Sequence, residues 1–170
     1  MKFMPYEYLR LESTLAVADI HQKLERVIEP KRHFKLFEKS SKPYEGRIEG
    51  TRFEVSRILD YRNALRPNIV GHIQAQPQGS TVSISMKPDL VAIVFMLLFL
   101  GGVGLSFFMT LAPVLSSSVE LSTATWHSLI SLGAIFIALY VFFLAFFKFE
   151  SAKSKDFLLD LLDAREVEEL

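Results

Sequence analysis

Two apolar runs decide the fold, Leu90–Val119 (LVAIVFMLLFLGGVGLSFFMTLAPVLSSSV) and Leu121–Phe147 (LSTATWHSLISLGAIFIALYVFFLAFF). They hold thirty and twenty-seven residues, without a single Asp, Glu, Lys or Arg. A helix of about 20 apolar residues crosses the hydrocarbon core of a bilayer, so each run is long enough. The remaining chain is too short to cover two such helices on all sides. The sequence therefore predicts an integral membrane protein with spans at about 90–113 and 125–147.

The charges around the runs predict their orientation. The connector Ser116–Thr125 has no Lys or Arg, and its only charged residue is Glu120. Basic residues stand on the outer sides of both runs: Arg62, Arg66, Lys87, Lys148, Lys153 and Lys155. Because Lys and Arg stay on the cytoplasmic side, we expect both termini in the cytosol. The first 85 or so residues hold no run typical of a signal peptide. The expected location is a bacterial inner membrane or an internal membrane.

Composition argues against several functions. There is no Cys, and the four His residues lie far apart, so we expect no metal site and no cofactor. We also find no nucleophile–base pair and no phosphate-binding loop, and we expect no enzymatic activity. Residues 1–89 have fifteen Lys and Arg against eleven Asp and Glu, whereas residues 148–170 have four against seven. The basic part could attract the acidic tail or anionic lipid headgroups, but its excess is too small to indicate nucleic acid.

The segments outside the runs predict an α+β domain. Tyr6–Leu15 and the hairpin Tyr44–Leu59 alternate in polarity like half-buried strands, and a second hairpin turns at Pro77-Gln78-Gly79. An amphipathic helix begins at Val17, and Pro30 is expected to end it. Residues 31–43 are basic and aromatic, which fits either a membrane-surface segment or a solvated connector.

The second apolar helix is expected to continue past the membrane. An apolar stripe follows the run, consisting of Phe157, Leu158, Leu161 and Leu162. We expect this stripe to cover the sheet. The predicted fold is thus an antiparallel sheet of about five strands with an N-terminal and a C-terminal helix, interrupted by a two-helix transmembrane hairpin. Residues 1–89 and 148–170 would form the cytosolic domain, and residues 90–147 the hairpin.

Two resemblances follow from these residues. The run Tyr44-x-Gly46-x-Ile48-x-Gly50-x-x-Phe53-x-Val55-x-Arg57-Ile58, continued by Tyr61-Arg62-Asn63 and Pro67-x-Ile69-x-Gly71-x-Ile73, resembles a group of small bacterial two-span membrane proteins. That group has no agreed activity to transfer. The order of strand, helix, antiparallel sheet and closing helix is similar to the helix-grip architecture of START-like lipid- and ligand-binding proteins. The chain departs from it in strand number and in its membrane insertion.

Arg57 is the most unusual polar residue. It follows Phe53 and Val55 in the two-residue alternation, so it should point inward, where an arginine needs an anionic partner. The partner could be a lipid headgroup, shared with Arg47 or Arg62, or a carboxylate of this chain. A β-bulge that returns Arg57 to solvent is a third alternative. The candidate ligand-binding residues are Arg47, Arg57, Tyr61, Arg62 and Asn63, although Asn63 could simply shape a turn.

Small residues on both apolar runs offer close helix packing. They are Gly101, Gly102 and Gly104 on the first run and Ser131, Gly133 and Ala134 on the second. They could serve the hairpin itself or a protein partner, including a second copy of the chain. The alternative functions are an accessory or scaffold subunit of a larger membrane complex, a membrane-tethered lipid or amphiphile binder, and an enzyme. The first is the expected function.

Overall fold

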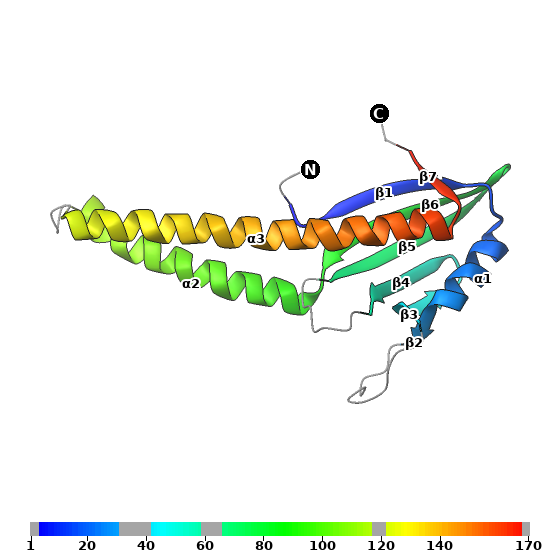
Figure 1. Cartoon of the computed structure of the whole chain (residues 1–170), viewed down its shortest axis with the longest axis horizontal. Helices are drawn as coiled ribbons and strands as arrows, with labels where there is room; N and C mark the ends of the chain where they lie inside the picture. The colour runs from blue at the N-terminus through cyan, green and yellow to red at the C-terminus, as the bar shows by residue number, and fades with distance from the viewer. Residues whose placement is uncertain (1–3, 31–41, 59–65, 117–121, 168–170) are drawn as a thin grey trace. The chain divides into compact units, whose positions relative to one another are not determined.

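A computed structural model describes residues 4–30, 42–58, 66–116 and 122–167. The chain divides into two compact units. One consists of Met1–Asp89 and Phe147–Leu170 and is called the sheet domain below; the other, Leu90–Phe146, is called the apolar hairpin. The described residues form seven strands and three helices (Figure 1).

The sheet has the strand order β2-β3-β4-β5-β6-β1-β7. Its strands are β1 (Glu7–Ser13), β2 (Ile28–Pro30), β3 (Tyr44–Glu49), β4 (Arg52–Arg57), β5 (Pro67–Gln76), β6 (Gly79–Pro88) and β7 (Ala164–Glu166). Neighbouring strands are antiparallel, except that β2 is parallel to β3.

The prediction of about five strands is wrong, because β2 and β7 were missed. Each has only three residues, which is too short for polarity alternation to be recognised. Helix α1 (Val17–Val27) ends one residue earlier than its apolar stripe, and Ile28 starts β2. The two predicted hairpins are confirmed as β3–β4 and β5–β6.

The first strand of the chain lies inside the sheet. Strand β1 pairs with β6 along its whole length, so that Leu9 faces Ile84 and Leu11 faces Val82. On its other side it pairs with β7 over Leu11–Ser13. This edge of the sheet therefore depends on pairing between β1 and β7, which are far apart in the sequence.

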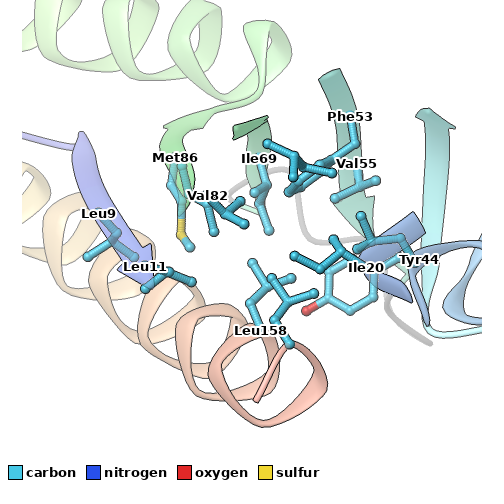
Figure 2. Packing of buried hydrophobic residues seen from close by; sticks show 14 of the residues in the cluster. Leu9, Leu11, Ile20, Tyr44, Phe53, Val55, Ile69, Val82, Met86 and Leu158 are labelled. Atoms are coloured by element: carbon cyan, nitrogen blue, oxygen red, sulfur yellow. The ribbon is translucent and has the colours of Figure 1, made fainter. Parts of the chain in front are cut away.

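The hydrophobic core lies on one face of the sheet. Ile20 and Leu24 of α1 are buried there. Leu158, near the end of α3 (Thr123–Leu161), and Leu162, which directly follows this helix, are buried on the same face. Figure 2 shows side chains of these elements converging: Leu9, Leu11, Ile20, Val55, Ile69, Val82, Met86 and Leu158. Phe157 and Leu161 are partly buried against the same cluster. The predicted apolar stripe after the second run thus packs on the sheet, as expected.

The apolar hairpin contains helix α2 (Leu90–Leu115) and the first part of α3. Both helices are long and apolar enough to cross a membrane, and only 6% of the most apolar window of each is buried within the structure. Helix α3 has 39 residues and is continuous through Ser151–Ser154. One helix therefore carries the second apolar run and the stripe that covers the sheet.

Candidate functional site

Strand β4 directs Arg57 to the covered face of the sheet. Phe53 and Val55, which share its side of the strand, are 0% and 1% exposed. In the antiparallel register Arg57 lies opposite Tyr44 of β3, which is also buried. The regular pairing continues to Arg57, so a bulge does not return it to the outer face. Its side chain is 33% exposed, at the margin of the core.

The partner of Arg57 is Glu150 of helix α3. Nη1 of Arg57 lies 3.5 Å from Oε2 of Glu150, whose side chain is only 1% exposed. Nζ of Lys153 lies 3.9 Å from the other carboxylate oxygen. A buried carboxylate is stable only with compensating charge or hydrogen bonds. The anionic partner of Arg57 in the structure is therefore a carboxylate of this chain.

Polar side chains surround this ion pair beneath the sheet. We use the term polar seam for Tyr44, Arg57, Glu150, Ser151 and Ser154. Burial raises the pKa of the Tyr44 hydroxyl, whereas the Ser154 side chain and the charge of Arg57 act in the lowering direction. The Tyr44 ring also packs against Phe157, with centroids 5.0 Å apart. The seam therefore joins β3 and β4 to α3 by polar as well as apolar contacts.

The polar seam is better suited to holding the helix than to catalysis. Ser151 and Ser154 are 0% exposed and Glu150 is 1% exposed, so a substrate could not reach them without separation of α3 from the sheet. Among the residues that the structure describes, no group of three His, Asp or Glu could hold a metal ion. The polar seam is thus a buried ion pair with compensated charge, which holds α3 against the sheet.

The structure separates the other candidate ligand-binding residues from Arg57. Arg47 has the opposite phase in its strand and is 66% exposed, with ion pairs to Glu49 at 3.3 Å and Glu54 at 3.6 Å. Arg47 and Arg57 therefore occupy opposite faces of the sheet, and the expected shared clamp is not formed between them. The other three candidates, Tyr61, Arg62 and Asn63, lie outside the described residues.

Sequence reasoning missed Glu150, although a signal was present. Phe147, Glu150, Ser151, Ser154 and Leu158 recur at helical spacing, and all five are buried. They extend the apolar stripe of the C-terminal helix toward the span. An acid within such a stripe is the natural complement of an inward arginine on the sheet.

The small residues of the apolar hairpin divide into two groups. A Cβ atom on Gly104 would lie 3.6 Å from the ring of Phe136, and one on Gly133 would lie 3.8 Å from the ring of Phe107. These two glycines therefore belong to the contact between α2 and α3. At Gly101 and Gly102 a Cβ atom would meet nothing within 4 Å. Ser131 and Ala134 are likewise exposed.

Over the residues that the structure describes, the fold and site thus define an α+β protein with a seven-stranded sheet and two helices apolar enough to cross a membrane. The chain matches no family model, no curated protein and no solved structure. Its function has to be inferred from its own residues.

Proposed function

We propose that this chain is an integral membrane protein that acts as an accessory or scaffold subunit of a larger membrane complex, without enzymatic activity. Both termini would face the cytosol, and the membrane would be a bacterial inner membrane or an internal one. The observation that supports this role best is the open face of α2 at Gly101 and Gly102.

That face is suited to a partner helix. Glycines without a side chain allow two helix backbones to approach closely, which favours association in a lipid environment. Gly104 and Gly133 serve the contact within the hairpin, whereas Gly101 and Gly102 have open space in front of them. The partner could be a different protein or a second copy of this chain.

The alternative function is a membrane-tethered lipid or amphiphile binder with Arg57 as its headgroup ligand. The scaffold role is preferred because Arg57 already contacts an anion of this chain, the carboxylate of Glu150. A scaffold role requires only a stably folded domain, and the polar seam contributes to that by tying α3 to the sheet.

Affinity purification of the full chain in mild detergent, followed by mass spectrometry, tests the scaffold role. The informative variant is Gly101→Leu/Gly102→Leu, which adds bulk to the open face. Ala145→Leu is the matched control, because it adds the same side chain at another exposed position on α3. We expect the variant to lose a co-purifying protein that the wild type and the control retain. The same set of proteins with all three chains would contradict a scaffold role for this face.

A further inference from the structure

We propose that the open edge of strand β1 at Glu7–Leu9 binds an extended segment of a partner protein as an additional antiparallel strand. This inference rests on the proposed scaffold role and adds the kind of partner surface that the sheet domain fits. All the residues that carry it belong to the sheet domain.

Strand β7 covers only part of β1. It pairs with Leu11–Ser13, and the N–H of Val167 extends this pairing by donating to the carbonyl of Arg10 at 2.9 Å. Among the described residues, no strand pairs with Glu7–Leu9 on that side. Strand β1 is therefore covered on this edge over its second half and open over its first half.

The open edge presents the backbone groups of Tyr8. The carbonyl of Arg10 points toward β7, and the backbone groups of residues two apart on a strand point the same way. The N–H and C=O of Tyr8 therefore point away from β6 and toward the line that β7 follows. An unpaired donor and acceptor at a sheet edge form a template for another strand. Peptide segments bind to many proteins in this way.

A groove beside this edge gives room for the added strand. It has a volume of about 460 Å³ and is lined by residues 6–9 at the start of β1 and by Lys148, Ala152 and Lys155 of α3. These three residues are spaced at i, i+4 and i+7, which places them along one side of the helix. A strand that continued the line of β7 would therefore have β1 as its neighbour and this side of α3 as its cover.

The charges of the groove are already compensated. Nζ of Lys148 donates to the Glu7 carboxylate at 2.8 Å, and Lys155 is paired with Glu166 of β7. Neither lysine is left to attract an anion, and the exposed Ala152 stands between them on the helix. The groove therefore favours a neutral occupant that supplies backbone hydrogen bonds.

Side chains of the added strand would alternate between two environments. A residue opposite Leu9 would point to the side of α3, where Ala152 is small and exposed. A residue opposite Tyr8 would lie on the other face of the sheet, beside a ring that is 50% exposed. Aromatic and β-branched side chains form favourable cross-strand pairs. We therefore expect a partner segment with an apolar residue opposite Leu9 and a β-branched or aromatic residue opposite Tyr8.

The test measures binding of a fluorescent peptide of alternating Thr and Val residues to the purified full chain in mild detergent, by fluorescence anisotropy. The same peptide with N-methylated backbone amides is the matched negative probe, because it keeps the side chains but cannot donate to a strand edge. We expect saturable binding of the first peptide only. Hydrogen–deuterium exchange of the Tyr8 amide should slow when that peptide is bound.

Two variants test where the peptide binds. Tyr8→Pro removes the N–H at an edge position where proline is tolerated, and it should weaken binding about tenfold through the lost hydrogen bond. Tyr8→Thr is its matched control, since it also loses the ring but keeps the N–H, and it should bind within about threefold of the wild type. Ala152→Leu fills the groove without changing β1 and should abolish binding, which covers the case in which Tyr8→Pro disrupts the sheet.

Three results would overturn the proposal: no saturable binding of the alternating peptide, equal binding of its N-methylated form, or undiminished binding by Ala152→Leu. If binding appeared only after deletion of residues 168–170, the occupant of the edge would be the chain's own C-terminal residues and not a partner. The assay contains no partner protein and leaves α2 unchanged. Its failure is therefore distinct from failure of the scaffold role that is tested at Gly101 and Gly102.

Discussion

Removal of Arg57 should destabilise the sheet domain more than removal of its partner Glu150. The reason is that the side chain of Glu150 is 1% exposed whereas that of Arg57 is 33% exposed. In Arg57→Leu a buried carboxylate remains, with Nζ of Lys153 at 3.9 Å. In Glu150→Gln the guanidinium that remains can still reach water.

The expected magnitudes follow from this asymmetry. Removing one partner of a buried ion pair costs about 3–5 kcal/mol, and the proximity of Lys153 places Arg57→Leu near about 3 kcal/mol. Glu150→Gln keeps the shape of the side chain and should cost about 1–2 kcal/mol. The double variant Arg57→Leu/Glu150→Gln removes both charges of the pair, so it should also cost only about 1–2 kcal/mol, which implies a coupling energy of about 3 kcal/mol.

These values can be measured by a double-mutant cycle on the full chain in detergent. Trp126 is the only Trp and lies in the apolar run, so its fluorescence does not report on the sheet domain. Pulse proteolysis in denaturant, with cleavage mapped by mass spectrometry to residues 66–88, does report on it. A larger loss for Glu150→Gln than for Arg57→Leu, or additive losses without coupling, would refute this account of the ion pair.

Three further predictions concern the core, alkaline pH and topology. Leu162→Ala should cost about 2–5 kcal/mol in the same proteolysis assay, because Leu162 is fully buried, whereas Val167→Ala at an exposed site should change stability by less than about 0.5 kcal/mol; equal effects would show that the C-terminal stripe does not hold the core. The pKa of Tyr44 is raised in the folded state, so this hydroxyl keeps its proton more tightly when the protein is folded. Its contribution to stability is therefore fully present below the ordinary pKa of 10.0 and is lost as pH rises from that value through the folded-state pKa. Thermal unfolding should therefore show a steeper alkaline loss of stability for the wild type than for Tyr44→Phe, and parallel curves would contradict this. For topology, Ser117→Cys should react with a membrane-impermeant maleimide from outside the cell; reaction only after the cytoplasm is exposed would invert the proposed orientation.

Much of the local structure could be predicted because it depends on residues close in sequence. The two apolar helices follow from long runs without charge, and β3–β4 and β5–β6 follow from alternation around short turns. The inward phase of Arg57 was predictable for the same reason. Residues two apart on a strand share a face, so Arg57 shares the face of Phe53 and Val55, which are buried. The C-terminal stripe likewise indicated that α3 would cover a sheet.

Only the tertiary structure decided which distant residues meet. No local pattern specifies that β1 lies between β6 and β7. The same is true of the pairings that add β2 and β7 at the two edges of the sheet. Identification of Glu150 as the partner of Arg57 required the position of α3 on the sheet. The separation of Arg47 from Arg57 follows instead from the register of β3 and β4. The contacts of Gly104 and Gly133, and the open face at Gly101 and Gly102, depend on how α2 and α3 pack. The physical reason is common to all of these: periodicity determines which face of an element is apolar, whereas burial of that face depends on elements far away in the chain.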